Sequence, residues 1–255
     1  EDVIGRDDEF PVSGHSIKSK LFSVPDCQRI IKKAVSVRLG EKFGLERLPE
    51  TGKRYRIEFF LFKDKVSMMI DLSGTPLHKR GYRPETVEAP IRETLAAAMV
   101  KISRPREDVL LWDPFCGSGT IAIEAAMQMR NIAPGINRSF SAEEYPIFPI
   151  ESWKTAREKA KAAIKTDSKF EAYATDIDPK CVEIASAAAK RAGVDDMLNI
   201  FTMDALDIDT LGRRGTIVTN PPYGDRLLTV DEANDLYRAM GQAFSRLDRW
   251  QIYVI

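Results

Sequence analysis

The sequence LWDPFCGSGT at residues 111–120 decides the fold. An apolar run leads into Asp113 and a turn with two glycines, and the alanine-rich run that follows predicts a helix that starts near Thr120. Gly117 and Gly119 let the backbone turn sharply and approach a ligand where a Cβ atom would collide. In an open α/β sheet, ligands bind at this edge. Because the chain has neither G-x-G-x-x-G nor a Walker lysine, the glycines alone do not name the ligand.

Length, composition and charge limit the classes of protein to which the chain can belong. The 255 residues suffice for one large domain or two ordinary ones, and the apolar content of 44% predicts a sizeable core. A formal net charge of zero gives no general case for nucleic acid or membrane. Three cysteines without a CxxC, beside two histidines, predict reduced thiols in a cytoplasmic protein with no bound metal. No apolar run approaches transmembrane length.

From residue 90 onward, strand and helix patterns alternate, which predicts a parallel α/β sheet. A helix opened by Pro90 precedes the first strand. Later strands are expected at 170–175, 198–203, 216–219 and 251–255, with helices at 152–164, 179–191 and 233–247. Since the chain ends on the fifth strand, we expect it to be a fragment truncated there.

Residues 1–80 predict a small, incomplete α+β module. Its expected elements are a strand at 17–21, a helix from Pro25 to Gly44, and a hairpin of strands 55–62 and 66–72. Between residues 15 and 60, eleven Lys and Arg stand against five Asp and Glu, a net charge of +6. Such a module could bind the phosphate backbone of a nucleic acid, and a solvated helix face explains the charge equally well. The turn at 81–84 is the expected boundary with a second domain at 81–255.

Acidic residues follow the second and third strands of the predicted sheet. Asp176 can accept hydrogen bonds from both hydroxyls of a ribose, whereas its neighbour Asp178 is better explained as the N-cap of the helix opened by Pro179. Asp204 could accept a proton from an adenine amino group while the Ala205 amide faces a ring nitrogen. Taken alone, Asp204 is an ordinary turn residue. Its position at the same sheet edge favours a nucleotide site.

The tetrapeptide Asn220-Pro221-Pro222-Tyr223 follows the fourth strand. Its two prolines fix φ, so the Asn220 side-chain oxygen and the Pro221 carbonyl can together accept both protons of a flat exocyclic amine. Tyr223 offers a π-face to the base that carries this amine. The matching electrophile is the sulfonium methyl group of S-adenosylmethionine (SAM), with catalysis by in-line positioning and desolvation. As an isolated match, the tetrapeptide could be a loop without chemistry.

Together these residues resemble the class I SAM-dependent methyltransferases, and more narrowly the bacterial THUMP-domain RNA methyltransferases of the RlmL-like and YpsC-like 23S rRNA guanine-N2 family. The resemblance is carried by the segments 81–83, 89–97, 113–120, 131–135, 176–179 and 220–224, and by the long spacer between the first two strand ends. It implies a Rossmann-like sheet, lacking its last strands, after a partial THUMP domain that binds RNA. It also implies methyl transfer from SAM to the N2 amine of a guanosine, with RNA, most specifically 23S rRNA, as partner and neither DNA nor membrane.

The candidate residues follow from these two lines of reasoning. The predicted cofactor-binding residues are Asp113, Phe115, Cys116, Gly117, Ser118, Gly119, Thr120, Asp176, Ile177, Asp204 and Ala205. The predicted catalytic residues are Asn220, Pro221, Pro222 and Tyr223. Cys116 is interpreted as a small packing residue, because amine methylation needs no covalent intermediate. The chain by itself is expected to be a poor enzyme, since target docking would need further surface.

Three alternatives stay open. Two are other amine methyltransferases, acting on adenine N6 in DNA or on protein glutamine, which use similar Asn-Pro-Pro-Tyr loops. The THUMP-like module and the long spacer argue against both. The third is a non-catalytic RNA-binding assembly factor that has kept the fold.

Overall fold

The computed structural model describes residues 3–83, 90–210, 212–223 and 229–255, and it divides into two compact units. The first unit consists of residues 1–76 and 139–156, and the second of residues 77–138 and 157–255. The sequence predicted one boundary at residue 80/81, whereas the first unit also takes in a segment from the long spacer. Part of the predicted boundary turn and of the motifs, namely Pro84, Ala89 and Gly224, lies outside the described residues.

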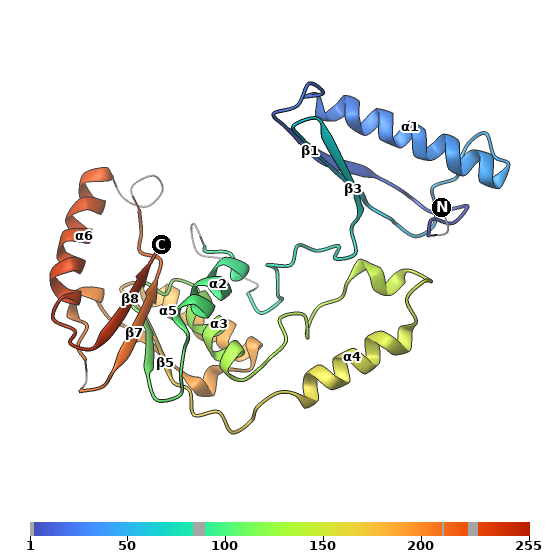
Figure 1. Ribbon diagram of the computed structural model, residues 1–255. Coiled ribbons are helices and arrows are strands. Elements are labelled where there is room, and N and C mark those ends of the chain that lie inside the picture. Colours follow the sequence, from blue (N-terminus) through green and yellow to red (C-terminus); the bar gives the residue numbers. More distant parts are fainter. Residues whose placement is uncertain (1–2, 84–89, 211, 224–228) are drawn as a thin grey trace. The chain divides into compact units, whose positions relative to one another are not determined.

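The second unit is built on a parallel sheet of five described strands in the order β6-β5-β4-β7-β8 (Figure 1). Their bounds are β4 Leu110–Asp113, β5 Ala172–Asp176, β6 Leu198–Thr202, β7 Gly215–Thr219 and β8 Trp250–Val254. The predicted α/β class and all five predicted strands are confirmed. Because β4 pairs with both β5 and β7, the strand order reverses at β4, the place where such sheets bind ligands.

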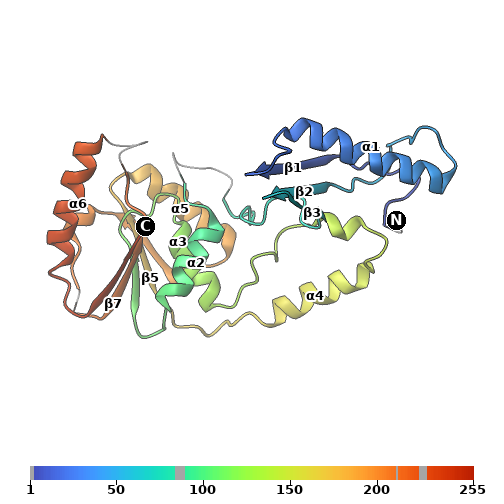
Figure 2. The ribbon, with the colours of Figure 1, turned by 45° about the horizontal axis from the view of Figure 1, so that its top comes forward.

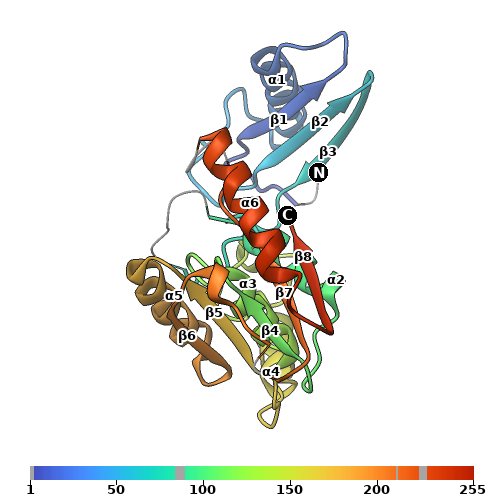
Figure 3. The same ribbon diagram turned by 90° about the vertical axis from the view of Figure 1, so that its left-hand side faces the viewer.

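Helices cover both faces of this sheet. One face carries α2 (Glu93–Ser103), α3 (Thr120–Met129) and α5 (Pro179–Ala192), and the other carries α6 (Val230–Phe244), which lies in front of the sheet in Figure 3. Alternation along β4 sends Leu111 into the first core and its two neighbours into the second. Within the described ranges, no helix is both long and apolar enough to cross a bilayer.

The first unit packs one helix, α1 (Val24–Phe43), on a three-stranded sheet (Figure 2). Strand β1 (Val12–Ile17) runs parallel to β2 (Ile57–Phe62), which forms an antiparallel hairpin with β3 (Lys65–Ile70). The hairpin is confirmed, and Lys63 and Asp64 at its turn have φ values of 48° and 61°. The predicted strand at 17–21 is wrong. Strand β1 pairs with β2 over the six residues from Val12 to Ile17 and ends there.

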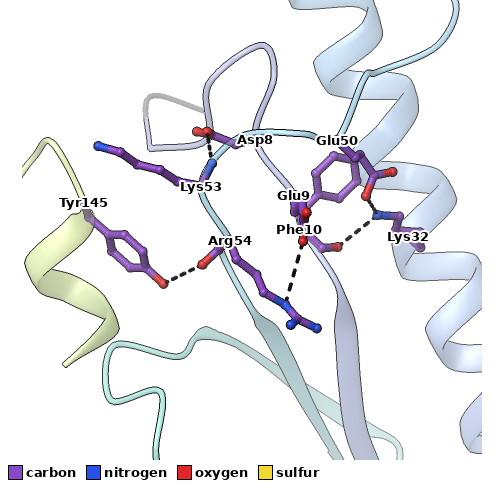
Figure 4. Close-up of polar contacts among 8 residues, drawn as sticks. All are labelled: Asp8, Glu9, Phe10, Lys32, Glu50, Lys53, Arg54 and Tyr145. Carbon is purple, nitrogen blue, oxygen red and sulfur yellow. Dashed lines mark hydrogen bonds and ion pairs between the residues drawn. The ribbon is translucent and has the colours of Figure 1, made fainter. Parts of the chain in front are cut away.

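The segment 139–156 belongs to the first unit because aromatic side chains hold it there. It contains the 3-10 helix η1 (Ser141–Glu144) and the start of helix α4 (Ile150–Ala162). The buried rings of Tyr145 and Tyr55 stack with centroids 4.2 Å apart. The Tyr145 hydroxyl donates to the Asp71 carbonyl at 3.0 Å and lies 3.4 Å from the Arg54 carbonyl. Figure 4 shows Tyr145 pointing at Arg54, on the chain that enters β2.

Candidate active site

A cavity of about 610 Å³ opens at the carboxyl ends of the central strands of the second unit. This volume is in the range of pockets that hold small molecules and nucleotide cofactors. Most predicted site residues line it: Asp113, Phe115, Gly117, Ser118, Asp176, Ile177, Asp204, Ala205, Asn220, Pro221, Pro222 and Tyr223. Three predicted residues are not part of the lining: Cys116 and Gly119 in the glycine loop, and Thr120 at the start of α3.

The glycine loop is fastened to the neighbouring strand β5. The Asp176 carboxylate accepts the Gly117 N–H at 2.9 Å, and the Cys116 N–H donates to the Thr175 carbonyl at 2.9 Å. Gly117 and Gly119 have φ values of 52° and 75°, which L side chains rarely adopt. The loop is therefore shaped by backbone conformation and by one carboxylate, and the N–H groups of Cys116, Gly117 and Gly119 are donated within the protein.

Asp113 is buried and ties the ends of two strands together. Its carboxylate accepts the Thr219 hydroxyl at 2.7 Å, from the end of β7, and the Phe115 N–H at 3.3 Å. Burial raises the pKa of Asp113 from 3.8 to about 7. The geometry gives Asp113 the role of joining β4 to β7, and a direct contact with a cofactor stays a prediction.

Two further carboxylates cap short turns at the same edge. Asp178 accepts the Lys180 N–H at 2.9 Å, so its interpretation as the N-cap of α5 is confirmed. Asp204 accepts the Leu206 N–H at 2.9 Å and begins the 3-10 helix η3 (Ala205–Asp207). Both also line the cavity. Hydrogen bonds from backbone N–H groups therefore hold both carboxylates in place.

Cys116 is a packing residue in this structure. Its side chain is buried, and burial raises the pKa of the thiol well above its ordinary value. A nucleophilic cysteine needs a lowered pKa. The geometry therefore supports the packing interpretation.

The Asn-Pro-Pro-Tyr loop leaves the end of β7 and borders two cavities. A second cavity, of about 560 Å³, shares Pro90, Ile91, Asn220 and Tyr223 with the first. The Tyr237 hydroxyl on α6 donates to the Pro222 carbonyl at 3.1 Å and so ties the loop to α6. Asn220 and Tyr223 therefore line both spaces.

Sequence reasoning missed the apolar walls of the cavity and the arginine that supports one of them. The missed lining residues include Pro90, Ile91, Ile121, Ile184, Leu206 and Leu236. Arg83 donates to the Ile91 carbonyl at 3.0 Å and to the Thr120 hydroxyl at 3.1 Å, and pairs with Glu93 at 3.2 Å. From sequence, Arg83 belongs to the boundary turn and to a segment that carries the resemblance, and no role was predicted for its side chain. An arginine in a Gly-Tyr-Arg turn was a usable signal, whereas the aliphatic residues look like any core residue.

The residues of the larger cavity fit the predicted cofactor. Carboxylates at Asp176 and Asp204 suit a ribose and an adenine amino group, and Ile177 and Leu206 offer apolar surface to a flat base.

Comparisons with known proteins agree with this geometry. Residues 80–255 match the family described as RMKL-like, methyltransferase domain, and residues 1–71 match the THUMP domain. The chain is 45% identical over 249 residues to "Putative RNA methyltransferase YpsC" of Bacillus subtilis (strain 168), which is 97% of this chain and 65% of that protein. It is 40% identical over 212 residues to the ribosomal RNA large subunit methyltransferase K/L of Vibrio parahaemolyticus, covering 79% of this chain and 30% of that protein. The chain thus spans about two thirds or less of these relatives.

Solved structures give the same result. A protein from Listeria monocytogenes, described as a "predicted N6-adenine-specific DNA methylase", superposes with a TM-score of 0.91 at 44% identity over 100% of this chain and 67% of that one. The protein SMU.472, crystallised with S-adenosylhomocysteine (SAH), superposes with a TM-score of 0.90 at 38% identity over 99% of this chain and 67% of that one. Since SAH is demethylated SAM, the predicted cofactor is confirmed. The chain therefore belongs to the RMKL-like methyltransferase family, with a THUMP domain ahead of its methyltransferase domain.

Proposed function

We propose that this protein transfers a methyl group from SAM to the exocyclic N2 amine of a guanosine in RNA, most specifically in 23S rRNA, in the cytoplasm. The observation that carries the proposal is the position of Asn220 and Tyr223 between two adjoining cavities. We assign the first cavity to the cofactor and the second to the acceptor base. A two-substrate transfer needs such a shared border, because the reacting atoms must approach within about 3–3.5 Å.

The chain's own residues orient the amine. When bound, SAM supplies an electrophilic methyl group. The Asn220 side-chain oxygen and the Pro221 carbonyl accept the two amine protons, which turns the nitrogen lone pair toward the cofactor cavity. Tyr223 stacks on the base and Tyr237 holds the loop through the Pro222 carbonyl. The nitrogen becomes cationic on methylation and then releases one proton to solvent, so no strong base is needed.

The RNA part of the proposal is supported by the first unit and by the relatives. A THUMP match, a net charge of +6 over residues 15–60, and relatives named as RNA or ribosomal RNA methyltransferases all favour RNA. Guanine N2 and 23S rRNA come from the resemblance to the RlmL-like family. A DNA adenine-N6 methyltransferase is the second candidate, favoured by the name that the Listeria protein carries.

The test is transfer of a tritiated methyl group from SAM to separate RNA, DNA and protein substrates. We expect label in large-subunit rRNA, recovered as N2-methylguanosine after nuclease digestion. Asn220→Ala should abolish transfer and leave SAM affinity, measured by calorimetry, nearly unchanged. Label found only in DNA or protein would refute the RNA proposal. Transfer that survives Asn220→Ala would refute the assigned site, and absence of SAM binding would favour a non-catalytic assembly factor.

A further inference from the structure

The sheet of the first unit exposes two aromatic side chains in its central strand. Burial alternates along β2: Phe59 and Leu61 pack under α1, whereas Phe60 and Phe62 on the opposite face are each 39% exposed. A phenylalanine contributes to folding mainly through burial of its ring. Two exposed phenylalanines in a central strand therefore call for a binding role, as exposed apolar patches generally do.

The two rings form a flat platform. Their centroids lie 6.0 Å apart and their planes differ by 12°. Strand register continues the platform sideways, with exposed His15 and Ile17 of β1 beside Phe60 and Phe62. The result is a strip of ring and aliphatic surface running across two strands.

One end of this strip is cationic. Lys63 lies with Nζ 5.2 Å from the Phe62 ring centroid, and Lys65 pairs with Phe62 across the hairpin. The turn after β1, which carries Lys18 and Lys20, meets this hairpin through backbone and side-chain hydrogen bonds.

Acidic residues do not cancel that charge. Asp64 is the acid in the hairpin turn, and its carboxylate accepts the Lys20 N–H at 2.7 Å. Glu58 lies on the same face at the far end of β2, opposite Met69. With four lysines and Asp64, the end of the strip has a net charge of +3.

We propose that this face binds single-stranded RNA, with bases stacked on Phe60 and Phe62 and phosphates held by the lysines around Lys63. Exposed aromatics on a sheet, flanked by lysines, are the surface that unpaired bases and their backbone require. A protein partner is less well matched, because lysine is depleted in protein interfaces. The inference rests on the proposed function for the choice of RNA, and it adds the surface that holds the substrate away from the reacting base.

Fluorescence anisotropy of the 255-residue chain with a labelled oligouridine of about ten nucleotides tests this. Phe60→Ala and Phe62→Ala should each weaken binding about fivefold or more, and the Trp variants at both positions should retain it. Lys63→Ala with Lys65→Ala should lower the salt dependence of log K by about 1.4. Val66→Ala with Met68→Ala is the matched control, because these exposed apolar residues of β3 lie on the α1 face and should leave binding unchanged.

Three outcomes would overturn the inference: no oligouridine binding by wild type, unchanged binding in the Phe60→Ala/Phe62→Ala variant, or equal losses in the Val66/Met68 control. A wild-type dimer in sedimentation that this variant converts to a monomer, with RNA affinity unchanged, would assign the face to contacts between copies. Asn220→Ala should bind oligouridine like wild type. If the wild-type chain binds oligouridine as expected and transfers no methyl group, the proposed function is refuted and this inference stands. If the chain transfers methyl groups and the Phe60 and Phe62 variants bind oligouridine like wild type, this inference is refuted and the proposed function stands.

Discussion

The Asp176 carboxylate accepts the backbone N–H of Gly117, 59 residues earlier in the chain, at 2.9 Å. Its second oxygen accepts the Asp178 N–H at 3.0 Å. A single side chain thus holds the loops that follow β4 and β5 side by side. Both loops line the cofactor cavity, so this carboxylate shapes the site in addition to any bond it makes with a ribose.

Asp176→Ala should weaken SAM binding about tenfold or more, because charge-assisted hydrogen bonds contribute about 1.5–3 kcal/mol. Calorimetry with SAM and with SAH measures the effect. Asp178→Ala is the comparison: loss of the α5 N-cap should lower the free energy of unfolding by about 1 kcal/mol and weaken SAM binding less than Asp176→Ala does. Equal loss of affinity in the two variants would contradict the distinct roles.

Gly119→Ala should destabilise the fold by more than Gly193→Ala. Both glycines have positive φ, 75° and 69°, so both variants carry the cost of about 1–2 kcal/mol for a left-handed alanine. A Cβ on Gly119 would also come within 2.9 Å of the Ala185 Cβ on α5, whereas nothing lies within 4 Å at Gly193. The difference between the two variants in free energy of urea unfolding measures the cost of the close contact between the loop and α5. Similar midpoints would show that α5 moves aside without cost.

Tyr237→Phe should lower kcat and leave SAM affinity unchanged. The hydroxyl that donates to the Pro222 carbonyl is lost while the ring stays, so the Asn-Pro-Pro-Tyr loop becomes looser. A displacement of about 1 Å in a positioning group can cost up to 100-fold in rate. Single-turnover methylation measures the change. Tyr223→Phe is the comparison, since it keeps the stacking face, and a larger loss there would assign the hydroxyl of Tyr223 a role that stacking does not require.

Stability should fall as pH rises from about 4 to about 7, partly because of Asp113. Its pKa is about 7 in the folded chain and 3.8 ordinarily, so the folded state holds more protons than the unfolded state in this window. Asp113→Asn should flatten the fall, by an amount of order 1.4 kcal/mol per pKa unit. Denaturant unfolding across this range measures it.

The control for this prediction is Asp196→Asn. The side-chain hydrogen bond from Arg130 lowers the pKa of Asp196, so its stabilising effect is lost only at lower pH and the slope above about pH 4 should be unchanged. Burial also raises the pKa of Glu124 to about 7, so Glu124 contributes to the same fall. A wild-type slope that survives both Asp113→Asn and Glu124→Gln would contradict the assignment.

Local signals in the sequence predicted the elements that form locally. The helix start at Thr120, the helix end at Gly44 and the Lys63-Asp64 turn each depend on a few neighbouring residues, and all are present. The convergence of Asp176, Asp204 and Asn220 was predictable because parallel strands end at one edge.

Contacts between distant residues could not be predicted in this way. The position of β1 depends on its register with β2, some 45 residues away, and the placement of 139–156 depends on the stacking of Tyr145 on Tyr55. The walls at Ile91, just ahead of α2, and at Leu236, on α6, are aliphatic residues far apart in the chain, and nothing in their type distinguishes a cavity wall from a core residue.

The stacking of Tyr145 on Tyr55 has a consequence for the exchange of domains between genes and for protein engineering. The chain passes between its two units at 76/77, 138/139 and 156/157. A gene fusion that transfers residues 1–76 alone leaves Tyr55 without its stacking partner. Deletion of residues 1–76 likewise leaves Tyr145 in the remaining chain without Tyr55. We therefore expect that an exchange of the first unit between relatives has to move residues 1–76 and 139–156 together to keep this stacked pair.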